Sequence, residues 1–160
     1  TLTCELGTES LKLFDPVPLM THFINQVQGL KPYTNTLNTI LAELYSNALE
    51  HGLLGLDSSL KNSAQGFARY YALRHERLLA LTEGSIKFEM AHEPSEQGGR
   101  LILQVTDSGE GFVIPTAQKQ LGAISNYHGR GIRLIETLCQ RLEFLPPGNS
   151  VIVEFDWKWL

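Results

Sequence analysis

The sequence predicts an α+β domain, a two-layer α/β sandwich in which helices cover one face of a mixed, mostly antiparallel sheet. Apolar residues recur at helical spacing through most of the first half of the chain, whereas runs typical of strands cluster in the second half. The length of 160 residues suits one domain with its own core. Because the chain does not begin with Met, we expect residues 1–160 to be a single domain cut from a longer protein.

Helices dominate the first half of the predicted order. Residues 2–6 and 11–14 are short apolar pieces consistent with an entry strand. An Asp-Pro pair then gives a helix start signal, and Gly29 and Gly52 are candidate helix ends. The helices that we expect here are residues 15–30, 34–52 and 64–82, with a loop at 53–63.

Strands dominate the second half. Residues 85–90 alternate between apolar and polar, and residues 100–107 form a mostly apolar run, so the two predict a hairpin around a turn at 93–99. The remaining expected elements are a mobile loop at 113–128, a helix at 131–142, a turn at 146–150 and a last strand at 151–157.

The composition excludes several classes of function. A formal net charge of −4 argues against a general nucleic-acid binder, which needs a basic surface, and leaves only a local basic patch open. No apolar run approaches the roughly 20 residues that span a bilayer. The two cysteines, Cys4 and Cys139, do not form a pattern typical of a zinc site. We therefore expect a cytoplasmic protein whose partners include neither nucleic acid nor a membrane.

A polar line runs along the second predicted helix, in the stretch ELYSNALEHG at 43–52. Glu43, Asn47 and His51 recur every fourth residue, with Glu50 beside them. Residues four apart in an α-helix are rotated by only about 40°, so the three should climb one face. One interpretation is an ordinary solvated stripe; the other is a functional line of side chains.

A second motif, VTDSGEGF at 105–112, follows the predicted buried strand. Asp107 ends that strand and could accept a hydrogen bond from an exocyclic amine, while Gly109 and Gly111 let the backbone approach a flat ligand. The alternative is a glycine-rich turn with an Asp cap. The further oxygen ligands of a calcium loop are missing.

A third motif, HGRGIRLIETL at 128–138, opens a helix with Gly129, Arg130 and Gly131. Backbone amides at a helix N-terminus suit phosphate oxygens, and the arginine adds positive charge. The alternative is a flexible loop before a helix. The motif is neither a Walker loop, because no GK[ST] follows, nor a Rossmann fingerprint, because the third glycine is absent.

In this order, the three motifs resemble those of the GHKL ATP-binding superfamily, which includes gyrase, histidine kinases and mismatch-repair ATPases. The resemblance spans residues 34–155 and implies a Bergerat-type fold that binds ATP and Mg²⁺. It implies that Asn47 is the Mg²⁺ ligand and that Asp107 accepts from the adenine amine. Gly109 and Gly111 would shape the adenine pocket.

The resemblance also assigns the phosphate end of the site. Gly129, Arg130 and Gly131 lie where the superfamily's ATP lid meets the phosphates, and His51 occupies a nucleotide-binding position that is often polar or basic. Glu43 stands where ATPases and anti-sigma serine kinases carry a general base. Histidine kinases tend to carry His or Asn there, so Glu43 favours a serine/threonine kinase.

Within the superfamily, the chain looks most like the anti-sigma-factor serine kinases of bacterial partner switching, which also occur fused to receiver and serine-phosphatase domains. The resemblance implies phosphorylation of a STAS-domain anti-sigma antagonist, binding to a sigma factor, and a homodimer. Two alternatives stay open: an ATP-binding interaction module with little transfer, and a histidine-kinase catalytic domain. Residues 55–83 depart from the minimal kinases, and we interpret them as an added helix that covers the core or offers a partner or dimer surface.

Overall fold

A five-stranded sheet forms one layer of this computed structural model, which describes residues 1–111 and 130–160. The strands lie in the order β1-β2-β3-β5-β4, and each pairing between neighbours is antiparallel. Their bounds are β1 (Leu2–Gly7), β2 (Ser85–Ser95), β3 (Gly98–Asp107), β4 (Arg141–Leu145) and β5 (Ser150–Lys158).

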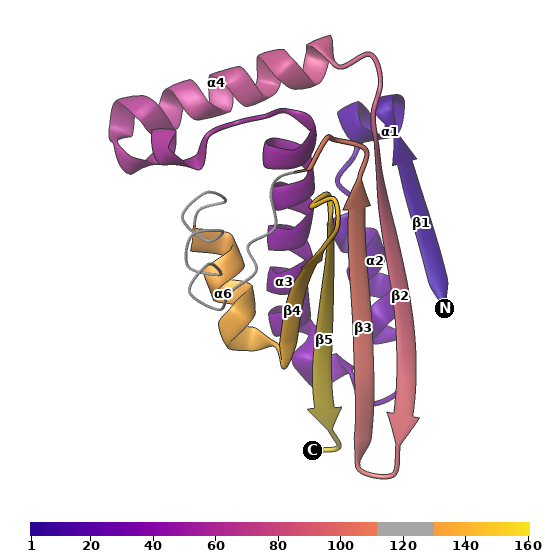
Figure 1. Cartoon of the computed structure of the whole chain (residues 1–160). Coiled ribbons are helices and arrows are strands. Elements are labelled where there is room, and N and C mark those ends of the chain that lie inside the picture. The colour runs from indigo at the N-terminus through magenta and orange to yellow at the C-terminus, as the bar shows by residue number, and fades with distance from the viewer. Residues whose placement is uncertain (112–129) are drawn as a thin grey trace.

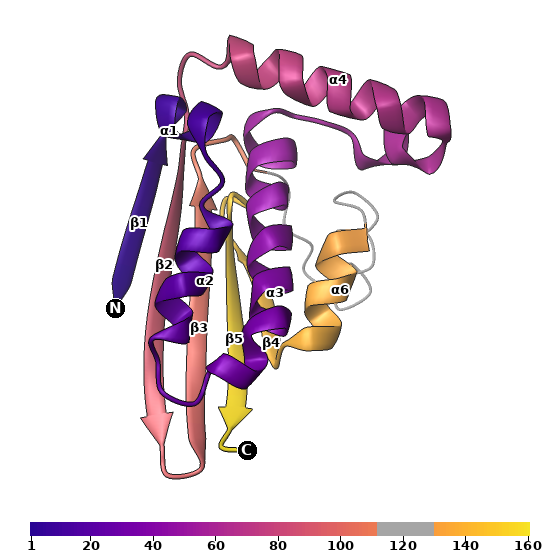
Figure 2. The same ribbon diagram turned by 180° about the vertical axis from the view of Figure 1, so that it is seen from behind.

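Helices form the second layer. Figures 1 and 2 show α2, α3 and α6 on one face of the sheet, with α4 running across the end of α3. The α-helices are α1 (Thr8–Leu13), α2 (Val17–Asn25), α3 (Thr34–Ser46), α4 (Ala64–Ala80) and α6 (Arg130–Leu138). Shorter elements are the 3-10 turns η1 (Lys31–Tyr33) and η3 (Ser58–Asn62) and the π-helical segment η2 (Asn47–Leu53).

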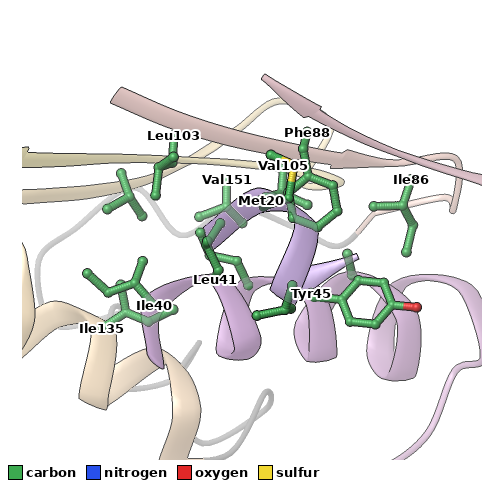
Figure 3. Close-up of a cluster of buried hydrophobic side chains, with 14 of the residues drawn as sticks. Met20, Ile40, Leu41, Tyr45, Ile86, Phe88, Leu103, Val105, Ile135 and Val151 are labelled. Carbon is green, nitrogen blue, oxygen red and sulfur yellow. The ribbon is translucent and has the colours of Figure 1, made fainter. Parts of the chain in front are cut away.

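The core lies between the two layers. Alternate residues of the central strands face the helices, because successive strand side chains point to opposite faces of a sheet. Figure 3 shows side chains from α3, among them Leu41, meeting Leu103, Val105 and Val151 of the sheet. Leu41 is fully buried, with an exposed fraction of 0%. The apolar arc of α3 therefore holds the helix, and every polar group on it, in place on the sheet.

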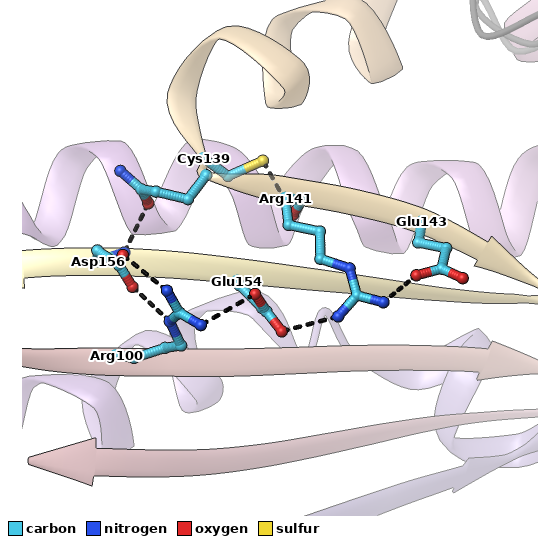
Figure 4. A network of polar contacts seen from close by, with 7 residues as sticks. Arg100, Cys139, Arg141, Glu143, Glu154 and Asp156 are labelled. Atoms are coloured by element: carbon cyan, nitrogen blue, oxygen red, sulfur yellow. Dashed lines mark hydrogen bonds and ion pairs between the residues drawn. The ribbon is translucent and has the colours of Figure 1, made fainter. Parts of the chain in front are cut away.

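Among the described residues, the opposite face of the sheet carries ion pairs and is not covered by a helix (Figure 1). Arg100 on β3 binds Asp156 through two hydrogen bonds of 2.6 and 2.9 Å and lies 3.3 Å from Glu154. Arg141 on β4 contacts the same Glu154 at 2.9 Å and also binds Glu143 (Figure 4). These pairs are half-exposed and contribute little energy each, but they join three neighbouring strands in one register.

The expected two-layer α+β architecture is confirmed, with four corrections of detail. Residues 11–14 are not strand but the end of α1 and the residue after it. A strand would bury alternate side chains, yet Leu13 is 82% exposed while Leu11 is buried. The sheet is antiparallel throughout its described pairings rather than mixed.

The predicted helix at 131–142 is too long, because β4 begins at Arg141. Leu138 and Leu142 have helical spacing in the sequence, but Leu142 pairs with Val153 of β5. Pairing at the sheet edge outweighs the weak local helix preference of this stretch.

The hairpin turn is tighter than the range 93–99 predicted. β2 runs to Ser95 and β3 starts at Gly98, so only two residues connect the strands. Gly98 pairs with Lys158 of β5, and the position is a glycine because a Cβ there would overlap the backbone carbonyl of Trp157. The glycines thus serve close strand packing, which sequence alone does not distinguish from a turn.

The added helix α4 covers the end of α3 rather than the sheet. Tyr70 is its one buried residue, whereas the neighbouring aromatic residues Phe67 and Tyr71 are exposed. In the part of the chain that the structure describes, no helix has the length and apolar character needed to cross a membrane.

Shortening Leu41 should destabilise the domain. Leu41→Ala leaves a cavity between α3 and the sheet, and we expect it to lower the free energy of unfolding by about 2–5 kcal/mol. Leu19→Ala, on the exposed side of α2, should cost less than about 1 kcal/mol. Urea denaturation followed by circular dichroism measures both, and equal losses would contradict the assigned core.

Candidate functional site

A cavity of about 380 Å³ lies between η2 and the ends of β3 and β5, within the size range of small-molecule sites. The helical wall includes Asn47, His51 and Gly52. The strand wall includes Asp107 and Asn149. The other lining residues are Leu44, Ala48, Leu53, Leu54, Gly55, Val105, Gly109, Glu110, Gly111, Gly148 and Val151.

Asp107 is the last residue of β3 and the buried acid of the cavity. Its exposed fraction is 7%, and burial raises the pKa of its carboxyl to about 6. The Oδ1 atom accepts a hydrogen bond from the Gly109 amide at 2.8 Å. The side-chain amide of Asn149 donates to the Asp107 carbonyl at 2.7 Å. The first bond orients the carboxylate, and the second holds the Asp107 backbone at the strand end.

Glycines allow the backbone to pack directly on that carboxylate. A Cβ at Gly52 would overlap the Asp107 carboxylate, and a Cβ at Gly109 would overlap the Gly52 carbonyl. Gly111 has φ +79°, a left-handed conformation that favours glycine. The predicted sharp turn at Gly109 and Gly111 is thus present, next to the cavity.

Asn47 lines the same cavity and has a buried side-chain oxygen that is not hydrogen-bonded to any described residue. Its exposed fraction is 9%, and its Oδ1 accepts no hydrogen bond within the described residues. Buried polar atoms without partners are rare in proteins and call for a ligand, ion or water. Mg²⁺ prefers oxygen ligands such as this amide oxygen. Asn47 is therefore compatible with the Mg²⁺ that the family resemblance implies.

Asn47 would supply only one of the ligands of such an ion. Among residues 1–111 and 130–160, no group of three or more His, Cys, Asp or Glu side chains could hold a metal. Mg²⁺ commonly takes one or two protein oxygens and completes its octahedron with water and substrate phosphates. A single amide oxygen from Asn47 is consistent with a Mg²⁺ site of this kind.

Glu43 lies one helical turn before Asn47, close to the start of α6. A Cβ at Gly131 would overlap the Glu43 carboxylate, so a larger residue at 131 would require this side chain to move. Burial raises the pKa of Glu43 although Lys61 lowers it, and the charge of Glu50 adds to the rise. Glu43 is half-buried and is not among the residues that line the cavity.

His51 lines the cavity as a neutral ring. Its Nδ1 lies 2.7 Å from the carbonyl oxygen of Leu56, and since a carbonyl only accepts, Nδ1 carries the proton. Burial lowers the pKa of His51, although the hydrogen bond to Leu56 and the charge of Glu50 act in the other direction. Near pH 7 the ring therefore adds no positive charge to the site.

The helix that carries these residues changes type within the motif. The sequence predicted a continuous α-helix over 34–52, but from Asn47 to Leu53 the turn widens into a π-helix. The Leu54 amide accordingly bonds to the Leu49 carbonyl, five residues back, at 2.9 Å. The interpretation as a solvated stripe is wrong, because Asn47 and Glu50 are buried.

Other predicted residues are distributed as follows. Arg130 and Gly131 begin α6. Gly129 and the loop at 113–128 lie outside the described residues.

Sequence reasoning missed two residues of the site. The sequence predicts Gly52 as a helix end and Asn149 as part of a turn. The available signal for Gly52 was its position directly after His51, the last of the three polar residues on the predicted helix. Comparison with known proteins gave no match, either to a protein-family model or to a curated protein. The motifs and this geometry therefore carry the functional argument.

The buried carboxyl of Asp107 should make the stability of the domain depend on pH. Its pKa of about 6 in the folded state lies above the ordinary 3.8, so folding favours the protonated form. The resulting stabilisation is present below pH 3.8 and is lost as the pH rises through 6. Relative to Asp107→Asn, the wild type should lose about 2–3 kcal/mol of unfolding free energy between about pH 4 and 8.

Urea titrations of both proteins across this pH range provide the measurement. The variant keeps an oxygen that can accept from the Gly109 amide and removes only the titration. Parallel pH profiles for the two proteins would contradict the assigned burial of the carboxyl.

Proposed function

We propose that this chain is a Mg-ATP-dependent protein serine/threonine kinase domain with a Bergerat-type fold, acting as an anti-sigma factor or partner-switching regulator. The observation that carries the proposal is the pairing of two buried polar groups on one cavity. Asp107 lines it from β3, and Asn47, whose buried Oδ1 has no hydrogen-bond partner among the described residues, lines it from η2.

Asp107 supports the adenine end of the proposed site. With a pKa of about 6, its carboxyl is mostly ionised at neutral pH and accepts hydrogen bonds, as an exocyclic amine requires. Val105 and Val151 offer apolar surface beside it. The glycines at 109 and 111 leave room for the backbone to approach a flat ring.

Asn47 and the start of α6 support the phosphate end. Asn47 Oδ1 would hold Mg²⁺, which when bound neutralises charge on the phosphates. The first amides of α6, at Arg130 and Gly131, have no intrahelical partner and favour phosphate oxygens.

Glu43 supports transfer to a hydroxyl. Its raised pKa makes the carboxylate a better proton acceptor, and it lies one turn from the proposed Mg²⁺ ligand. We assign it as the base that takes the proton of a serine or threonine hydroxyl on a STAS-domain antagonist. A sigma factor is the other proposed partner.

A second candidate function is favoured by the place of Glu43 outside the cavity lining. In this alternative the chain is an ATP-binding interaction module, in which occupancy of the cavity sets partner affinity and little phosphate is transferred. Glu43 would then be structural, through its contact with the start of α6.

Replacing Asp107 by Asn should weaken ATP binding. Loss of a charged acceptor costs about 1.5–3 kcal/mol, which is roughly a 10- to 150-fold rise in Kd. The preference for ATP over GTP should fall as well. Calorimetry measures the ATP affinity of Asp107→Asn. The control is Asp156→Asn, the same change on the face of the sheet that carries the ion pairs. Equal ATP affinity in the two variants would exclude the adenine role of Asp107.

Substitutions of Asn47 and Glu43 should affect different steps, the first ATP binding and the second phosphoryl transfer. Asn47→Ala should weaken ATP binding in the presence of Mg²⁺ and have little effect without it. Glu43→Gln should keep Mg-ATP affinity but lower phosphoryl transfer by about 10²- to 10⁴-fold. Radiolabelled ATP and a STAS-domain antagonist measure transfer, with acid-stable label marking serine or threonine.

The result decides between the two candidate functions. Full transfer by Glu43→Gln would remove the base assignment. ATP binding without transfer by the wild type would favour the interaction module, and acid-labile label would indicate a histidine kinase.

A further inference from the structure

A buried carboxylate attaches α4 to the π-helical segment η2. Glu50 has an exposed fraction of 6%, and its Oε1 accepts a hydrogen bond of 2.5 Å from the Tyr70 hydroxyl. Its Oε2 accepts from Ser46 at 2.8 Å and from Arg74 at 3.4 Å. Lys61 lies 3.7 Å from Oε1. A charge buried this deeply is tolerated because both of its oxygens have partners.

The charge state of this contact is well defined. Burial raises the pKa of Glu50, but hydrogen bonds from Tyr70 and Ser46 and the charges of Lys61 and Arg74 together lower it below its ordinary value. Burial and the charge of Glu50 raise the pKa of Tyr70. Near neutral pH, a protonated phenol therefore donates to an ionised carboxylate, which is the stronger kind of hydrogen bond.

A second contact from α4 holds the end of the same segment. Arg77 donates to the carbonyl of Leu54 at 2.9 Å and to that of Gly55 at 3.1 Å. π-Helical turns are rare and occur mostly as single turns near functional sites. Here α4 contacts the segment both in its middle and directly after its end.

Other residues of the same segment form one wall of the candidate site. Asn47 lies three residues before Glu50, and Gly52, which packs on the Asp107 carboxylate, lies two residues after it. A side chain that holds the backbone at 50 therefore also limits the movement of the backbone at Asn47 and Gly52, which line the cavity.

We propose that Glu50 is a positioning residue: held by Tyr70, it fixes η2 so that Asn47 and Gly52 keep their places in the cavity, and it thereby couples α4 to ligand binding. The identity of the ligand, Mg-ATP, rests on the proposed function. Residues that orient direct ligands in this way typically change affinity by 10- to 100-fold when altered.

Tyr70→Phe tests the proposal because it removes only the hydroxyl and keeps the ring. We expect the Kd for Mg-ATP to rise about 10-fold and the amides of 47–54 to exchange hydrogen faster. Tyr71→Phe is the matched control, since Tyr71 is the exposed neighbour on the same helix, and it should change neither quantity. Measurements are made well below the melting temperature of each variant.

The outcomes separate this proposal from the proposed function. If the wild type binds Mg-ATP and Tyr70→Phe binds it equally well, the positioning role is overturned, even if the variant melts earlier. If the wild type binds no ATP, the proposed function fails; hydrogen exchange then decides alone, and unchanged exchange at 47–54 in Tyr70→Phe overturns the coupling.

A second pair keeps the test available if Tyr70→Phe does not fold. Arg74→Gln weakens the contacts of the same carboxylate and should raise the Kd about two- to fivefold. It is compared with Arg69→Gln, which changes an exposed arginine of the same helix. Equal affinity and equal exchange in these two variants would overturn the proposal.

Discussion

The contact between the end of η2 and the end of β3 is the constraint on which the site depends. At this point the Gly52 backbone lies against the Asp107 carboxylate and the Gly109 turn, with no room for a Cβ on either glycine. The contact brings a helical segment and a strand together although they are far apart in the sequence.

The rest of the fold maintains that contact from two directions. The buried arc of α3 packs on the inner face of the sheet, so the helix cannot slide along β3 without opening the core. From the other side, α4 holds η2 through Glu50 and through the carbonyls after its end. The π-helical turn between these two supports is therefore constrained at both ends.

The site concentrates groups that are unfavourable for stability. Asp107 is a buried acid with a raised pKa, and Asn47 has a buried oxygen without a hydrogen-bond partner among the described residues. Apolar residues at either position would make a more stable core. Such costs are expected where a protein keeps polar groups ready for a ligand, which is why these two residues carry the proposed function. Glu50 differs, because its partners are all within the protein.

The sequence by itself determined the architecture, most helices and strands, and the candidate residues of the site. Those features depend on local patterns: helical spacing around Leu41, apolar strand runs, and glycines around Asp107. The strand at Arg141–Leu145 and the two-residue hairpin turn were decided by pairing with distant strands, which no local pattern encodes. The same holds for the π-helical turn and for the Glu50–Tyr70 contact, which joins residues 20 positions apart. Only the tertiary structure could decide these features, because burial and partners across the fold, rather than local preference, give each of those conformations its stability.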